Sequence, residues 1–152
     1  MKKILYAILG LGVFVVIAFT IMGVQSRGAT APGITNMQLA GCGGKPNCVT
    51  SMSDPGSDEH IAPFKFERGS ADATWARLLE AIGAQGGELD TNAPPYMAAT
   101  FSSKIFRFVD DFECLIDQDL GLIHVRAGAR AGHSDFDVNR TRVESIRQAL
   151  AN

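Results

Sequence analysis

The chain has 152 residues, of which 46% are hydrophobic, and its formal net charge is −2. Lys2, Lys3 and Arg27 flank an apolar N-terminal run, so the rest of the chain carries eleven basic against sixteen acidic residues, a net charge of −5. Basic residues that neutralise phosphates supply most of the affinity for nucleic acids, so this composition argues against a nucleic-acid-binding protein. About 90–110 residues remain for a folded unit, which is enough for one modest core.

The apolar run covers Ile4–Val24 and contains no charged residue. At a rise of about 1.5 Å per residue it spans about 30 Å, the thickness of the hydrocarbon core of a bilayer. It therefore predicts one N-terminal transmembrane helix, with residues 1–25 as a membrane anchor. Lys2 and Lys3 outweigh Arg27, so we expect the N-terminus in the cytoplasm and the rest of the chain outside it.

A cleaved signal peptide is the alternative interpretation. The apolar region of a signal peptide usually has about 7–15 residues, fewer than this run. Ala29-Thr30-Ala31 has the form of a cleavage site, but it lies beyond Arg27. Leu39–Cys42 resembles a lipoprotein processing box, yet it is too far from the apolar run, and we interpret it as a coincidence. A retained anchor is favoured.

The residues after the anchor lack a hydrophobic period. Ser26–Asn36 is rich in Gly, Ala, Thr and Pro, so residues 26–41 are predicted to be a flexible linker that lets the following domain stand off the membrane. Residues 37–59 are expected to be irregular and to lie at the surface. The folded domain is predicted to occupy residues 42–152.

Periodic structure is predicted from Ile61 onward. A strand at Ile61–Glu67 precedes a helix at Ala71–Gln85, which Ser70 can cap and which places Trp75 on an apolar stripe. Strands are expected at Glu88–Thr91, Tyr96–Ser102, Arg107–Ile116 and Leu122–Arg130, and a last helix, capped by Ser134 or Asp135, carries Val143, Ile146 and Leu150. The order β-α-β-β-β-β-α predicts an α+β fold in which helices cover one face of an antiparallel sheet.

Cys42 and Cys48 enclose a segment with two glycines and a proline. In an oxidising compartment this spacing favours a disulfide, while two free thiols or a redox pair remain alternatives. Cys114 falls in a predicted strand and is expected to be a small buried hydrophobe. No metal-ligand spacing relates the histidines or cysteines, so neither a metal nor another cofactor is expected.

Charged residues are concentrated between Phe106 and Arg147. Arg126 and Arg130 share one face of a predicted strand, and Gly128 between them would allow a ligand to approach the backbone. With the N-terminus of the last helix they can form an anion pocket, whose candidate residues are Arg126, Arg130, Ser134, Asp135, Asn139 and Arg140.

A structural ion-pair network is the other interpretation of these charges. In it three acids pair with three arginines, namely Asp110, Asp111 and Asp135 with Arg126, Arg130 and Arg140. Because the opposite charges balance, the structural network is favoured over the pocket. No catalytic residues are assigned, since adjacent residues such as His133 and Ser134 in one turn cannot form a hydrolase relay.

Four motifs are similar to a known family. They are Pro46–Ser51, Phe108–Asp111, Ile123–Arg126 and, in the last segment, Ser134-Asp135 with Asn139-Arg140 and Arg142–Glu144. In this order they resemble the domain-of-unknown-function family DUF1499, found in bacteria and plant plastids, over roughly residues 42–150. The chain departs from the family where serines are usual, at Ala127–Ala129, and at His133, where an aromatic residue is usual. The resemblance implies a fold and a compartment but no activity.

These observations favour a membrane-anchored accessory or binding protein. We expect it in the bacterial inner membrane, with a cytoplasmic N-terminus and a periplasmic C-terminal domain, as a subunit or stabiliser of a membrane or envelope complex. The alternative is a small anionic-ligand-binding protein or enzyme that uses the cluster around Arg126 and Arg130.

Overall fold

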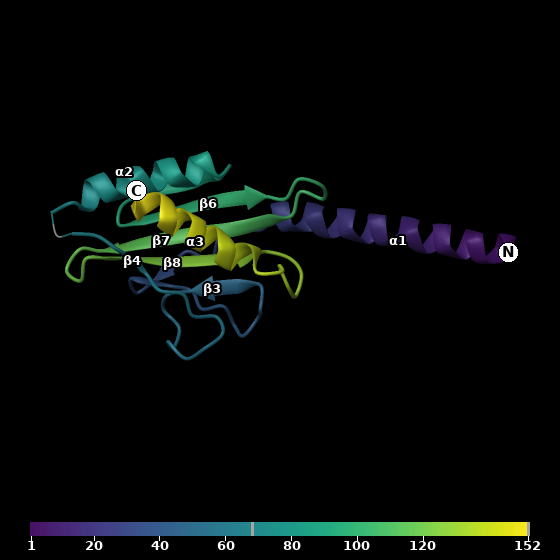
Figure 1. Ribbon diagram of the computed structural model, residues 1–152, viewed down its shortest axis with the longest axis horizontal. Coiled ribbons are helices and arrows are strands. Elements are labelled where there is room, and N and C mark those ends of the chain that lie inside the picture. The colour runs from purple at the N-terminus through teal and green to yellow at the C-terminus, as the bar shows by residue number, and fades with distance from the viewer. Residues whose placement is uncertain (68, 152) are drawn as a thin grey trace.

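A helix of 26 residues, α1 (Lys2–Arg27), projects from an α+β domain in the computed structural model, which describes residues 1–67 and 69–151 (Figure 1). Its apolar residues are exposed along most of its length, and the helix is long and apolar enough to cross a membrane. The predicted apolar helix is therefore confirmed, and it continues two residues beyond the predicted end of the anchor.

The main sheet has six antiparallel strands. Its order is β3-β8-β7-β6-β5, and β4 also pairs with β8, beside β3 on the same edge. The strands are β3 (Cys48–Thr50), β4 (Phe64–Lys65), β5 (Glu88–Ala93), β6 (Tyr96–Ser102), β7 (Val109–Asp117) and β8 (Leu122–Ala129). A separate two-stranded hairpin consists of β1 (Ile34–Thr35) and β2 (Gln38–Leu39).

Two helices, α2 (Ala71–Ala84) and α3 (Val138–Ala151), pack on one face of this sheet. In Figure 1 α3 crosses in front of the strands. Between helices and sheet lies one apolar core, whose fully buried side chains include Leu78, Ile82, Phe112, Val143 and Ile146. Burial of each such side chain stabilises the fold by about 1.5–3 kcal/mol. The predicted α+β architecture, with helices on one antiparallel sheet, is confirmed.

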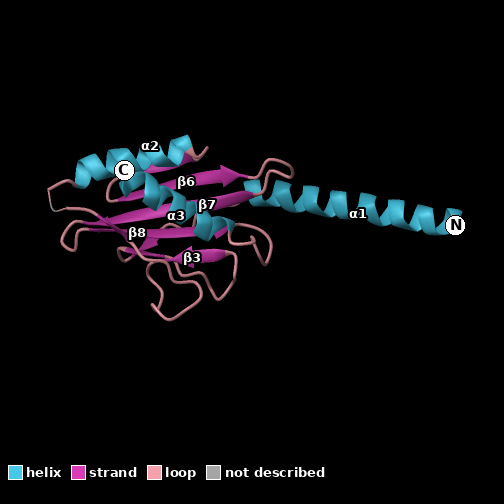
Figure 2. Ribbon diagram, in the orientation of Figure 1, coloured by secondary structure: helices cyan, strands magenta, loops and turns pink. Residues whose placement is uncertain are grey.

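The segment expected to be irregular contains strand β3. Its three residues are all buried, so the alternation of apolar and polar residues that identifies a strand is absent. Cys48 pairs with Gly128 and Thr50 with Arg126, so β3 extends the sheet beyond β8. The loops that follow β3 lie along this edge of the sheet (Figure 2).

The C-terminal end of α1 is part of the folded domain. Ser26 is 2% exposed, and its hydroxyl oxygen accepts the amide of Val109 at 3.1 Å. Its carbonyl oxygen accepts the guanidinium of Arg130 at 3.4 Å. Further along, the amide of Gly33 donates to the side chain of Glu113 at 2.8 Å. The segment predicted to be a linker thus begins inside the helix and continues along the sheet.

Close packing joins α1 to the loop between β6 and β7. A Cβ atom at Gly23 would lie 2.0 Å from the carbonyl oxygen of Phe106, so only glycine allows this approach. Four residues earlier, the ring of Phe19 lies 5.3 Å from that of Phe106 and 6.0 Å from that of Phe108, measured between centroids. Contacts of this kind contribute about 0.5–1.5 kcal/mol each beyond area burial.

We predict that Gly23→Ala loosens this junction. The added methyl group cannot fit against the Phe106 carbonyl, and overpacking of this kind costs about 1–3 kcal/mol. The hydrogen bond from the Val109 amide to Ser26 should then open more often, which faster hydrogen exchange at that amide would report in detergent micelles. Gly12→Ala in the same helix is the matched control, because nothing lies within 4 Å of its Cβ position. Equal protection of Val109 in both variants would contradict the prediction.

Candidate functional site

The face of the sheet opposite the helices carries buried charges. Side chains alternate along β7 and β8, so Asp111 and Glu113 project to the opposite face from Phe112. Asp111 is 3% exposed and Glu113 is fully buried. In the register of the two strands, Glu113 lies opposite Arg126, and Asp111 lies opposite Gly128. Charges at this depth are stable only when they are paired and hydrogen-bonded.

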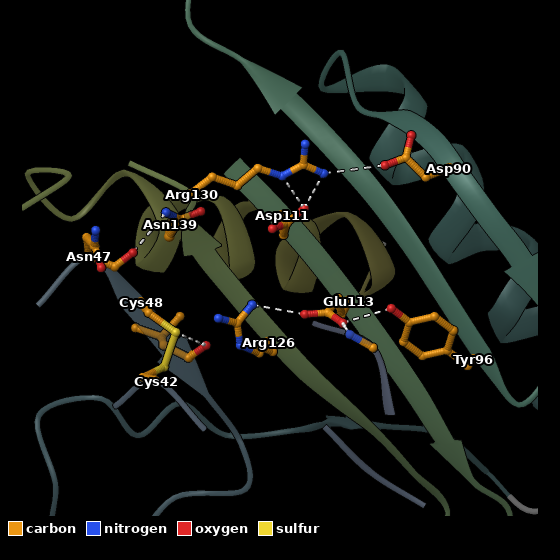
Figure 3. Close-up of polar contacts among 12 residues, drawn as sticks. Cys42, Asn47, Cys48, Asp90, Tyr96, Asp111, Glu113, Arg126, Arg130 and Asn139 are labelled. Carbon is orange, nitrogen blue, oxygen red and sulfur yellow. Dashed lines mark hydrogen bonds and ion pairs between the residues drawn. A yellow bond between two sulfur atoms is a disulfide. The ribbon is translucent and has the colours of Figure 1, made fainter. Parts of the chain in front are cut away.

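Arg130 pairs with Asp111 through two donors. Its Nε and one terminal nitrogen lie 2.9 and 2.7 Å from the same carboxylate oxygen, Oδ1 of Asp111 (Figure 3). The same terminal nitrogen is 3.7 Å from a carboxylate oxygen of Asp90, which is 48% exposed. The guanidinium also donates to the carbonyl of Ser26. The Arg130 side chain that makes these contacts is only 7% exposed.

Glu113 accepts hydrogen bonds from three parts of the chain. Arg126 donates to its Oε2 at 2.9 Å, while the hydroxyl of Tyr96 and the amide of Gly33 each donate to its Oε1 at 2.8 Å. Burial raises the pKa of Tyr96, and the neighbouring Glu113 raises it further, so Tyr96 stays a hydrogen-bond donor. The Nε of Arg126 is buried without a partner. Figure 3 shows this chain of contacts across the strands.

The candidate residues of the last helix lie apart from these two arginines. Asp135 accepts the amide of Asn139 at 2.8 Å and so caps the first turn of α3. The buried amide group of Asn139 donates to the carbonyl of Asn47 at 3.3 Å, and the hydroxyl of Ser134 accepts the amide of Phe136 at 3.3 Å. The contacts of Ser134 and Asp135 order the turn before α3, and that of Asn139 ties α3 to the segment before β3.

Arg140, the remaining candidate, donates to the main-chain carbonyls of Asp58 and His60. Arg140 was expected to pair with an acid, but it contacts the backbone of the loop after β3 instead. Asp110 pairs instead with Arg142, at 3.1 Å, on the helix side of the sheet. Burial raises the pKa of Asp110, although Arg142 acts in the opposite direction.

Cys42 and Cys48 form the predicted disulfide, and Cys114 is buried. Burial raises the pKa of the Cys114 thiol, so it stays protonated and unreactive. The disulfide also occupies the space above Gly128, where an added Cβ would lie 3.0 Å from the sulfur of Cys48. The expectation that Gly128 leaves room for a ligand is therefore wrong, because the glycine accommodates a cysteine of the neighbouring strand.

A hollow of about 780 Å³ lies beside the β7–β8 hairpin, with His124 and Ser51 in its wall. The Ser51 hydroxyl is 3.2 Å from Nδ1 of His124 and accepts the amide of Val125 at 3.0 Å. Burial lowers the pKa of His124, although Asp117 acts against it, so the neutral imidazole is favoured. The serine thus takes the place of a strand carbonyl, which accounts for its position without a chemical role.

The residues that sequence reasoning missed are Glu113, Tyr96 and Arg142. Arg142 is within a motif already noted and Glu113 lies two residues after another, but their partners depend on strand register and helix rotation, which the sequence does not specify. In residues 1–67 and 69–151, no three His, Cys, Asp or Glu side chains come together as a metal site requires. Each of the acids Asp110, Asp111 and Glu113 is paired with an arginine.

We predict unequal effects for the two acids that contact Arg130. Asp111→Asn removes the buried charge and leaves the guanidinium without its main partner, and breaking a buried pair in this way costs about 3–5 kcal/mol. Asp90→Asn removes a largely solvated contact, which is worth at most about 1 kcal/mol. Urea unfolding of the full chain in detergent measures both losses. Similar losses in the two variants would contradict the structural assignment.

Comparison with known protein families gives a match over most of the chain. The family model described as "Protein of unknown function (DUF1499)" matches residues 38–150, which include the whole main sheet and most of the helices that cover it. No curated protein matches the chain. Since the match covers well over half of the chain, this protein belongs to the DUF1499 family.

Proposed function

We propose that this protein is a non-enzymatic accessory protein of a bacterial inner membrane. Its N-terminus lies in the cytoplasm, α1 spans the bilayer, and the domain acts in the periplasm as a subunit or stabiliser of a membrane or envelope complex. The periplasmic location is supported by the disulfide between Cys42 and Cys48, because such bonds persist in oxidising compartments.

The observation that carries the proposal is the incorporation of α1 into the domain. Gly23 fits against the backbone of Phe106, and Ser26 supplies hydrogen-bond acceptors to Val109 and Arg130. A tether that only held the domain near the membrane would need none of these contacts. The junction instead orients the domain relative to α1, as is required to present one surface to a neighbour in the same membrane.

The same contacts argue against removal of α1 as a signal peptide. Cleavage after Ala31 would remove Ser26, which is buried, and leave the amide of Val109 without its acceptor. Cleavage would therefore remove contacts that the folded domain makes with α1, which favours a retained helix.

The alternative, an anionic-ligand site around Arg126 and Arg130, receives less support. The guanidinium of Arg126 donates to Glu113 and that of Arg130 to Asp111, so a buried carboxylate already balances the charge of each arginine. The other candidate residues, including Asn139 and Arg140, satisfy backbone groups of the domain itself. The contacts therefore favour the structural interpretation of the cluster.

We predict that the full chain keeps Met1, or at least the whole of α1, in the membrane and co-purifies with another membrane or envelope protein. Intact mass after gentle solubilisation measures the first outcome, and mass spectrometry of the tagged complex measures the second. Because the junction orients the domain, Gly23→Ala should lower the yield of the partner, whereas Gly12→Ala should not.

Two results would count against the proposal. A mature chain that begins after Ala31 would show that α1 is a signal peptide. A full-length protein that always runs alone, at its own mass, in every mild detergent would remove the accessory role.

A further inference from the structure

Large apolar side chains are exposed at the end of the sheet beside α1. Ile105, in the loop between β6 and β7, is 83% exposed, and Phe136, in the loop before α3, is 92% exposed. Figure 1 shows both loops at the same end of the domain, next to the emergence of α1. We call the set Ile105, Phe106, Phe108 and Phe136 the rim.

The rim lies at the level of the apolar part of α1. The rings of Phe106 and Phe108 are 5.3 and 6.0 Å from the ring of Phe19. Phe19 precedes Val24, the last residue of the apolar run, by five positions, which is about 7–8 Å along a helix. A bilayer that surrounds the apolar run would therefore also surround the rim, to the depth of about 5–10 Å that interfacial elements reach.

An apolar groove separates α1 from the loop before α3. It has a volume of about 500 Å³, and Phe19 and Met22 of α1 face Phe108, Phe136 and Val138 across it. The groove is open, and its apolar wall is continuous with the exposed surface of the helix. Such a surface is unfavourable in water and favourable against acyl chains.

The backbone holds Phe136 outward at a conformational cost. Phe136 and Asp137 have φ angles of 55° and 61°, in the left-handed region that bulky residues rarely adopt. The hydroxyl of Ser134 accepts the amide of Phe136 and helps to maintain this turn. An exposed aromatic ring fixed by an unfavourable backbone has no role in the core, which points to a contact outside the domain.

Basic residues flank the apolar tip of the other loop. Lys104 and Arg107 are exposed on either side of Ile105 and Phe106, and Arg27, at the end of α1, lines the same hollow as Arg107. Long basic side chains beside an apolar tip are typical of surfaces that enter the headgroup layer, where they reach lipid phosphates.

We propose that the rim is a lipid-contact surface. It lies in the leaflet on the domain's side of the membrane, acyl chains occupy the groove, and Lys104 and Arg107 contact phosphate headgroups. The inference rests on the proposed function, because it requires α1 to remain in the bilayer, and it adds lipid as a partner of the folded domain.

The test uses tryptophan as a reporter of lipid contact. Full-length Phe136→Trp and Ile105→Trp are reconstituted in vesicles of phosphatidylcholine and phosphatidylglycerol with brominated acyl chains, which quench tryptophan on contact. Trp75, the one native tryptophan, lies on the buried face of α2 in every variant and supplies the background and the check of folding. Both variants should lose a larger fraction of their emission than the wild type.

Leu120→Trp is the matched control. Leu120 is 65% exposed in the turn between β7 and β8, at the end of the domain away from α1, and should lose no more emission than the wild type. Quenching of Leu120→Trp equal to that of the rim variants would overturn the proposal, as would rim reporters that stay unquenched. A blue-shifted but unquenched rim reporter would indicate that a second copy of the chain covers the rim, and would overturn it too.

Phe14→Trp, in the middle of the apolar run, distinguishes failure of the lipid-contact surface from failure of the membrane anchor. If it is quenched and the rim reporters are not, α1 is an anchor and only the lipid-contact surface fails. If it is not quenched, the membrane anchor itself fails, and with it the proposed function.

Discussion

Two buried carboxylates, Asp111 and Glu113, place the strongest constraint on this structure. Buried acids require opposite charges and donors at fixed positions, and the structure supplies them from separate parts of the chain. Arg126 comes from β8 and Arg130 from the position just after it, the Tyr96 hydroxyl comes from β6, and a main-chain amide comes from the segment after α1. The register of the sheet, the path of the N-terminal segment and the position of α1 therefore depend on one another.

The period of hydrophobic residues was enough to predict both helices that cover the sheet and the strands from Tyr96 to Ala129, because each has one face in a single core. It missed β3, whose three residues are all buried and show no alternation. It also assigned Ser26 to a flexible linker, whereas Ser26 lies in α1 and its hydroxyl accepts the amide of Val109, which is 83 positions away. Long-range pairing of this kind leaves no local signal.

The candidate site illustrates the same limit. The sequence correctly identified the charged strands, but not which acid each arginine meets. Arg126 pairs with Glu113, which stands directly opposite it, and Arg142 reaches Asp110 from α3. Both choices follow from strand register and helix rotation. In this chain, residues of the family motifs make structural contacts. They pair charges on the face of the sheet opposite the helices, and they fix the start of α3 against the sheet.

The direction of the strands has a geometric consequence. β6, β7 and β8 run roughly along the line of α1, so the hairpin turn after Asp117 is the part of the sheet most distant from the helix (Figure 1). Nine residues of β7 span about 30 Å in extended conformation. The turn between β7 and β8 therefore lies about 30 Å from the end of α1, where Ser26 contacts the first residue of β7.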